Sequence, residues 1–298
     1  MIQFRNTFPT SLCLFFIAFA CSAQMLDNRE GLAFTDKPFF NTEFIRINKL
    51  KEFKGRFTYK KPGEVMRNTE YTYVYRFDDL GRLVESFETR RDDGTKDTTR
   101  NTYQYNTQHQ LLEHRKGDGK GYTATSYAYD EKGRVIEESY VREFVDTLGK
   151  PQRTVLNTET MTYEEFAGQL KKTVYNSFGL PYLRETTFFN ELGYVTSKDE
   201  FYIMTSTLKS HRYEYDDKGY LSAIRTFTDQ EETPREELVF LYDTFGNLTE
   251  KQLYRNGQYI TEIEMLYNER SMLLTYVLTR DVATNFIMIL GFKNPAYF

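Results

Sequence analysis

Few residues of this chain have the types and spacing that catalysis or metal binding requires. The 298-residue sequence contains three histidines, His109, His114 and His211. His109 takes the place of a glycine in a predicted turn and His211 opens a predicted strand, so both are expected to be solvent-exposed. The motifs of zinc hydrolases, serine hydrolases and phosphate-binding loops do not occur in the sequence. We therefore predict no catalytic residue, no metal site and no cofactor.

Paired carboxylates are the remaining route to catalysis, because a glycosidase needs two of them beside the bond that it cleaves. Adjacent pairs occur at Glu137-Glu138, Glu164-Glu165 and Glu236-Glu237. Consecutive strand residues point to opposite faces, so we interpret these carboxylates as solvated surface charges and predict a protein that is not an enzyme. A calcium loop at Asp92, Asp93 and Asp97 is conceivable, but a charged hairpin tip explains these residues more simply.

A turn motif, an aromatic residue followed by Asp, Asn or Glu, recurs eight times at intervals of about 26 residues, a period typical of repeat architectures. An Asp or Asn side chain can bond the backbone two residues further on, and a glycine three residues later supplies the positive φ of a short hairpin loop. Five copies contain both residues: Asp78 and Gly81, Asp130 and Gly133, Asn190 and Gly193, Asp216 and Gly219, and Asp243 and Gly246. The other copies are Tyr105-Asn106, Tyr163-Glu164 and Tyr267-Asn268.

The segments before these turns alternate in the manner of β-strands. Tyr71, Tyr73, Tyr75 and Phe77 share one parity, which predicts one packed face and one wet face. A second set of turns lies half a period away, so the chain reverses about every 13 residues. We predict an all-β fold, a repetitive antiparallel meander of about sixteen strands in two-strand repeats of about 26 residues, forming a curled sheet or open shell.

The motif resembles that of the YD-repeat (Rhs-type) family, whose consensus is close to Tyr-Asp-x-x-Gly-Arg-Leu. Residues 77–83 and 129–135 match it best, and the resemblance covers about residues 70–270. It implies strands that wind into a curled sheet or shell, sometimes around a toxin, and sugar binding is often suggested for the family. Since the sequence shows no long non-repeat C-terminal region, we expect a stand-alone exported repeat protein without a toxin or core-associated region.

The N-terminus has the features of a secretory signal. Arg5 precedes the apolar segment Leu12–Ala20, and small residues before Gln24 suit cleavage there. Residues 1–23 are therefore predicted to be a signal peptide, with lipidation at Cys21 as an alternative. Residues 24–70 form a lead-in segment with the first strands, and residues 71–298 form the repeat domain with a C-terminal capping strand. The expected location is periplasmic, secreted or on the outer surface.

Binding is the expected activity of the exported chain. A net charge of −4 without a basic stripe argues against nucleic acid as a partner. Four aromatic side chains are tentative ligand contacts: Phe144, Tyr182, Phe201 and Tyr202. We predict a non-enzymatic binding or structural module of the bacterial cell envelope whose partner is an unknown glycan or protein.

Two alternatives stay open. The first is an outer-membrane β-barrel, because the segment Phe286–Phe292 is apolar on both faces and the terminal residue is Phe298, although charges occupy the non-aromatic strand faces. The second is a glycan-active enzyme that uses two of the carboxylates. Membrane contact is expected only if Cys21 is lipidated or the sheet closes as a barrel.

Overall fold

The computed structural model of the chain describes residues 24–92, 95–117, 121–146, 148–229 and 231–298, without the side chains of residues 90–97. The predicted signal peptide and the three carboxylates of the calcium-loop hypothesis lie outside this description.

The described residues form one short helix and a long series of strands. The helix is α1, Thr42–Ile47. The strands are β1 Leu50–Lys60, β2 Arg67–Phe77, β3 Leu83–Asp92, β4 Thr95–Tyr105, β5 Leu111–Gly117, β6 Tyr122–Tyr129, β7 Val135–Val145, β8 Pro151–Phe166, β9 Gln169–Tyr175, β10 Pro181–Phe189, β11 Val195–Tyr202, β12 Thr207–Tyr215, β13 Leu221–Thr228, β14 Glu236–Tyr242, β15 Leu248–Arg255, β16 Gln258–Tyr267, β17 Leu274–Asp281, β18 Phe286–Phe292 and β19 Ala296–Tyr297.

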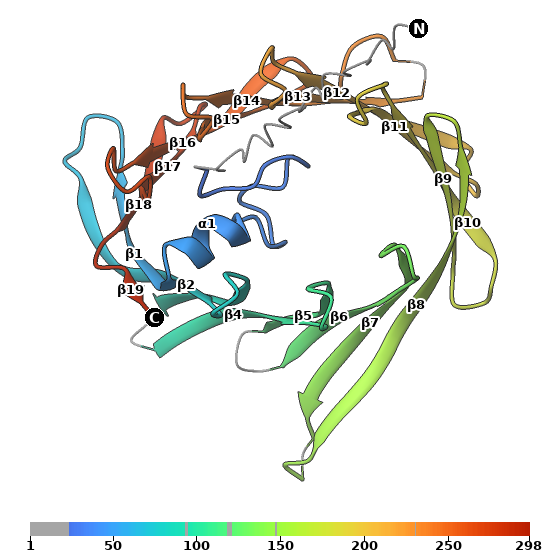
Figure 1. The fold of residues 1–298 in the computed structure, drawn as a ribbon. Coiled ribbons are helices and arrows are strands. Elements are labelled where there is room, and N and C mark those ends of the chain that lie inside the picture. Colours follow the sequence, from blue (N-terminus) through green and yellow to red (C-terminus); the bar gives the residue numbers. More distant parts are fainter. Residues whose placement is uncertain (1–23, 93–94, 118–120, 147, 230) are drawn as a thin grey trace, which may run out of the picture.

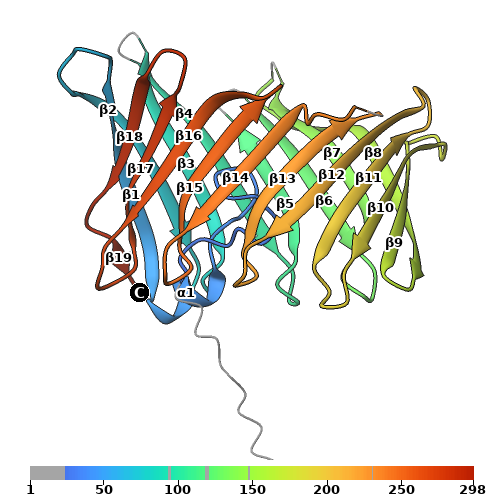
Figure 2. The same ribbon diagram turned by 90° about the horizontal axis from the view of Figure 1, so that it is seen from above.

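The sheet is an antiparallel meander that closes on itself. Each strand from β1 to β17 pairs with the next, and β18 pairs back onto β1, with Gly291 opposite Arg56. The result is an 18-strand barrel whose strands lie side by side around the wall (Figure 2). The short β19 adds to the end of β1. The predicted all-β meander is confirmed, whereas the predicted open shell is wrong. In an open shell β1 and β18 would be unpaired edge strands, but here they pair with each other.

The predicted strand number was low for an identifiable reason. Eight motifs predict eight hairpins, that is sixteen strands, which correspond to β2–β17. The strands β1 and β18 lie on either side of these hairpins and belong to no motif. One motif was also misplaced: Tyr163 and Glu164 lie inside β8, and the chain turns at Ala167 and Gly168 instead. Glu164 is followed by no glycine three residues later, so nothing there supplies the required positive φ.

The repeated turns are built in the same way around one side-chain oxygen. In the turn at Asp216, Oδ1 accepts hydrogen bonds from the backbone N–H of Lys218 (2.9 Å) and of Tyr220 (2.8 Å). The N–H of Gly219, at φ +84°, donates to the Asp216 carbonyl oxygen. The same hydrogen bonds occur at Asp78, Asn106, Asp130, Asp146, Asn176, Asn190 and Asp243.

A tyrosine at or near the end of a strand connects each of several hairpins to the one before it. The hydroxyl donates to a backbone carbonyl oxygen in the preceding hairpin, that of the first residue of its second strand. The pairs are Tyr105 and Leu83, Tyr129 and Leu111, Tyr163 and Val135, Tyr215 and Val195, Tyr242 and Leu221, and Tyr267 and Leu248, at 2.7–3.0 Å. These six hydroxyls therefore join consecutive hairpins through backbone carbonyl groups.

The N-terminal segment, residues 24–49, lies inside the barrel with α1. Figure 1 shows it near β1–β4 and β13–β18 and away from β8–β10. It brings Met25, Phe40 and Ile45 against inward-facing wall residues such as Phe53 and Phe240, and together these form the hydrophobic core. The core is therefore confined to one part of the barrel interior.

The outer face of the wall is rich in ion pairs. Arg76 on β2 binds both Glu52 (2.8 Å) and Glu85 (2.7 Å) on the neighbouring strands. On the opposite part of the wall, Arg225 binds Glu214 and Glu237 in the same manner. Charged side chains thus occupy much of the surface that points away from the barrel interior. No helix among the described residues is long and apolar enough to cross a bilayer.

Candidate functional site

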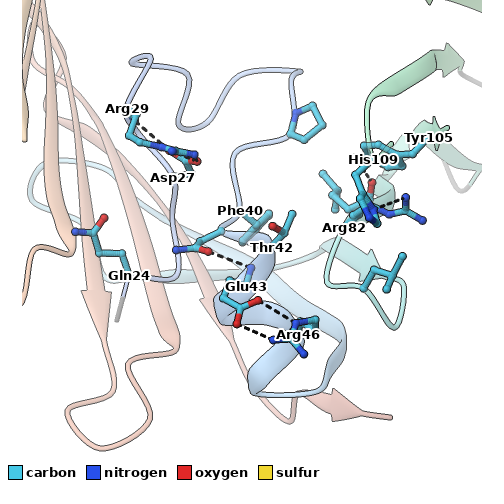
Figure 3. Close-up of a pocket in the computed structure, with 14 residues that line it drawn as sticks. Gln24, Asp27, Arg29, Phe40, Thr42, Glu43, Arg46, Arg82, Tyr105 and His109 are labelled. Carbon is cyan, nitrogen blue, oxygen red and sulfur yellow. Dashed lines mark hydrogen bonds and ion pairs between the residues drawn. The ribbon is translucent and has the colours of Figure 1, made fainter. Parts of the chain in front are cut away.

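A cavity of about 720 Å³ lies at one end of the barrel, between the N-terminal segment and the turns that follow β2 and β4 (Figure 3). Its cationic side chains have partners. Arg46 donates to Glu43 at 2.6 and 2.9 Å, and Arg29 donates from Nε to Asp27 at 2.9 Å. Arg82 forms an ion pair with Asp78 at 2.7 Å. This cavity therefore joins the N-terminal segment to the wall and offers little free charge to a ligand.

His109 lies at this cavity and takes the left-handed conformation that glycine has in the other turns, at φ +65°. Its Nδ1 is 3.3 Å from Nη1 of Arg82, whose guanidinium lies 4.8 Å from the centroid of the Tyr105 ring. The side chain is exposed, as the sequence predicted.

The other two histidines lie elsewhere and are not exposed. His114 stacks on Tyr103 with ring centroids 4.8 Å apart, and burial lowers the pKa of its imidazole. His211 places Nδ1 3.0 Å from the hydroxyl of Thr226. Within the described part of the chain, no three His, Cys, Asp or Glu side chains gather in a way that could hold a metal ion.

The inner wall of β9–β12 carries a chain of charged side chains. Nζ of Lys198 lies 2.8 Å from Glu185 and 3.0 Å from Glu200, and Lys172 pairs with Glu185 from the other side. His211 Nε2 lies 3.6 Å from Glu200. The strand register places these residues on the same face as the inward-pointing tyrosines of β8 and β12.

These contacts change the pKa of Glu200 in a definite direction. The contact with His211 is the strongest cause and the contacts with Lys198 add to it, so the pKa of Glu200 lies well below its usual range although burial opposes the shift. The carboxylate is therefore ionised at neutral pH and forms a fixed negative point on the inner wall.

The four tentative ligand contacts do not form one site. Tyr182 and Tyr202 lie together at the end of β10 and β11 that is away from the Asn190 turn. There the Ile203 N–H donates to the Tyr182 carbonyl (2.9 Å) and the Tyr202 hydroxyl donates to Glu200 (3.2 Å). Phe201 neighbours Tyr202 on the strand and faces outward opposite Arg184. Phe144 lies on β7 opposite Gln152, in a separate hairpin.

The carboxylate pairs are divided between the two faces of the wall. Glu138 points inward, directly opposite Glu159, whereas Glu137 lies opposite Thr160 on the outer face. Burial, followed by the nearby charge of Glu159, raises the pKa of Glu138. Sequence reasoning missed this inward pair because the two residues come from different strands, and only the register of β7 and β8 brings them together.

No family model and no curated protein matches this chain. Among solved structures, a porin-like protein from Bacteroides uniformis is 10% identical over 82% of this chain and 97% of that chain, with a TM-score of 0.37. The TcdB2-TccC3 structure is 15% identical over 74% of this chain and 15% of that chain, with a TM-score of 0.29. A LolA superfamily protein from Nitrosomonas europaea is 8% identical over 86% and 91% of the respective chains, with a TM-score of 0.20. These TM-scores are low, so we base no functional conclusion on the similarities.

Proposed function

We propose that this chain is an exported, non-enzymatic β-barrel of the bacterial cell envelope that binds a glycan at the inner wall of β9–β12. The observation that carries the proposal is the contrast between the two parts of the barrel interior. Side chains beside the N-terminal segment are buried, such as Phe53 and Phe240 at 2% and 1% exposure. On β9 and β11, the side chains of Lys172 and Lys198 keep 25% and 28% of their area exposed.

This half-buried part of the wall has the groups that sugar recognition uses. Lys198, Glu185 and Glu200 supply charged donors and acceptors, and Tyr182 and Tyr202 supply rings with a polar end. A binding site of this kind combines an apolar surface with a few fixed polar groups that set the orientation of the ligand. The hydrogen bonds among the charged residues hold them in place before any ligand arrives, which reduces the entropy lost on binding.

A glycan array probed with the chain from Gln24 onward tests this proposal. Replacing Tyr202 with Ala should weaken binding of any glycan identified by about tenfold, equivalent to about 1.4 kcal/mol. Phe201→Ala is the matched control, because Phe201 is the next residue on the same strand and faces the opposite side. Equal losses in the two variants, or an array without any bound glycan, would contradict the proposal.

An outer-membrane barrel is the second candidate, and the closed wall with an even number of strands favours it. The outer face is better suited to contact with water than with lipid, because ion pairs such as Arg76–Glu85 and Arg225–Glu237 point away from the interior. A charged side chain facing lipid at the bilayer midplane costs about 2–4 kcal/mol. We therefore propose that the barrel lies in the periplasm or on the cell surface.

Fractionation of the native host separates these two candidates. Release by buffer alone supports the proposed barrel in water, whereas retention until detergent is added supports insertion or lipidation at Cys21. The mass of the mature N-terminus then distinguishes lipidation from insertion. The glycan-active enzyme is tested separately, since turnover of a bound glycan that Glu138→Gln abolishes would establish catalysis and overturn the non-enzymatic proposal.

A further inference from the structure

The outer face of the barrel has a groove whose surface differs from the ion-paired wall around it. The groove has a volume of about 880 Å³ and crosses the wall from β16 to β2. The strand register arranges one row of its residues, with Leu266 opposite Tyr276, Tyr276 opposite Gly291, and Gly291 opposite Arg56. Since Arg56 is in turn opposite Thr72 on β2, the row spans four inter-strand gaps, or about 19 Å.

The floor of the groove is apolar. Leu278 and Ile289 lie opposite each other beside this row and point outward with Tyr276. A Cβ atom on Gly291 would lie 2.9 Å from Cε1 of Tyr276, so the glycine leaves the space that the tyrosine ring occupies. Leu266 and Tyr276 remain 49% and 41% exposed, which leaves an apolar surface in contact with water.

Three cations border this floor: Lys54, Arg56 and Lys293. All three are exposed, and within the described part of the chain none of them has an ion-pair partner. The carboxylate of Glu52 at the same border is held by Arg76 at 2.8 Å. The groove therefore combines an elongated apolar floor with uncompensated positive charge at its edge.

We propose that this groove binds one molecule of a single-chain anionic lipid. The acyl chain lies on Tyr276, Leu278 and Ile289, and the acidic head contacts Lys54 and Arg56. Burial of the acyl chain supplies most of the affinity, at about 25 cal/mol per Å² of apolar area removed from water. The charged border selects an acidic head over a neutral one. This site is on the outer face and does not depend on glycan binding at the inner wall.

Calorimetric titration of the chain from Gln24 onward with dodecanoate, below the concentration at which it forms micelles, tests the proposal. We expect one bound molecule per chain. Ile289→Glu should weaken binding by at least about tenfold, because it places a carboxylate on the apolar floor. Met288→Glu is the matched control, since Met288 is the adjacent residue of β18, faces the interior and is 41% exposed.

Charge reversal tests the border. The double variant Lys54→Glu, Arg56→Glu should weaken dodecanoate binding by about tenfold and leave binding of the neutral dodecanol unchanged. The control is the double variant Lys171→Glu, Arg184→Glu, which removes two exposed outward cations on β9 and β10 at a distant part of the wall. That control should bind dodecanoate with unchanged affinity.

Several results would overturn the proposal. Dodecanoate that binds equally well to the Ile289→Glu variant occupies another site, and equal losses in the Ile289 and Met288 variants point to the barrel interior. Dimerisation in analytical ultracentrifugation that Ile289→Glu abolishes, without dodecanoate binding, would assign the groove to a second copy of the chain. Co-sedimentation with phosphatidylglycerol vesicles, without binding of monomeric dodecanoate, would assign it to a membrane surface.

Discussion

The phenolic oxygen of Tyr267 lies 2.7 Å from the carbonyl oxygen of Leu248 and donates a hydrogen bond to it. Leu248 opens β15, the second strand of the preceding hairpin, so this contact joins two consecutive repeats. Burial raises the pKa of the Tyr267 hydroxyl, which keeps it protonated and able to donate at neutral pH. The repeated tyrosine thus serves the stacking of one hairpin on the next.

Tyr267→Phe should lower the free energy of unfolding by about 1–2 kcal/mol, because the Leu248 carbonyl loses its side-chain donor inside the barrel. Urea denaturation followed by circular dichroism measures the change. Tyr276→Phe is the control, since Tyr276 is 41% exposed on the outer face of the neighbouring strand and should lose almost nothing. Equal stability of the Tyr267 variant and the native chain would show that the bond contributes nothing.

The position of Phe189 supports this account of the tyrosine. The hairpin before Phe189 ends in the two-residue turn Ala167-Gly168, without the Asp-centred loop of the other repeats. The backbone N–H of Phe189 donates to the Gly168 carbonyl oxygen at 2.9 Å, so a backbone group makes the connection there. A side-chain hydroxyl is not needed for the connection at this position, and the motif has phenylalanine here in place of tyrosine.

The sequence predicted the turns and the strand alternation because both depend on residues within about four positions of each other. Asp216, for example, reaches only as far as Tyr220. The sequence indicated a closed barrel only as an alternative, because closure requires Gly291 to meet Arg56 from the far end of the chain, and no local pattern encodes the accumulated curvature of the sheet. The charged cluster on the inner wall of β9–β12 could not be predicted for a similar reason, since its residues come from separate strands that only the register brings together.

The sequence predicts the N-terminal segment only as part of a lead-in, although this segment carries much of the core. The signal was present in the sequence, where Phe39, Phe40, Phe44 and Ile45 form an apolar cluster ahead of the first repeat. What the sequence did not reveal was the surface against which this cluster packs. A barrel of this size has more interior than its own side chains can fill, which explains why an additional segment enters it.

Gly81 should tolerate substitution less well than Gly179, although both have positive φ, +81° and +73°. A Cβ atom on Gly81 would lie 2.1 Å from the carbonyl oxygen of Thr42 in α1, whereas Gly179 has no atom within 4 Å of that position. Each alanine variant should lose about 1–2 kcal/mol of stability, because a residue with a Cβ atom disfavours positive φ. Gly81→Ala should lose more, because α1 must also move, and thermal unfolding of the two variants makes the comparison. Equal melting temperatures would contradict the contact with α1.

Phe40→Ala should destabilise the barrel by about 3–5 kcal/mol, since a large buried ring is removed from the core. Phe40 is 6% exposed and lies 4.8 and 5.0 Å from the rings of Tyr75 and Phe77, measured between centroids. Phe178→Ala is the control, because that ring is 85% exposed in a turn. A barrel that unfolds at the same urea concentration without the Phe40 ring would show that the N-terminal segment adds little to stability.

Glu200 and Glu138 should affect the pH dependence of stability with opposite signs. Glu200 has a lowered pKa in the folded state, so its contribution is present above the unfolded pKa of about 4.3 and is lost as pH falls through the folded value. Glu138 has a raised pKa in the folded state, so its ionisation costs stability as pH rises through that value.

Glu200→Gln should therefore lower the free energy of unfolding at pH 7 by about 1 kcal/mol, allowing for the partial exposure of the site. Glu138→Gln should raise it by a few tenths of a kcal/mol, because the neutral amide removes the repulsion from Glu159. The Glu138 difference should be nearly gone at about pH 4, where the unfolded carboxyl groups become protonated, whereas the Glu200 difference only begins to shrink there. Urea titrations of the native chain and both variants from pH 4 to pH 8 measure these differences, and changes of the same sign in the two variants would contradict the opposite environments of the two carboxylates.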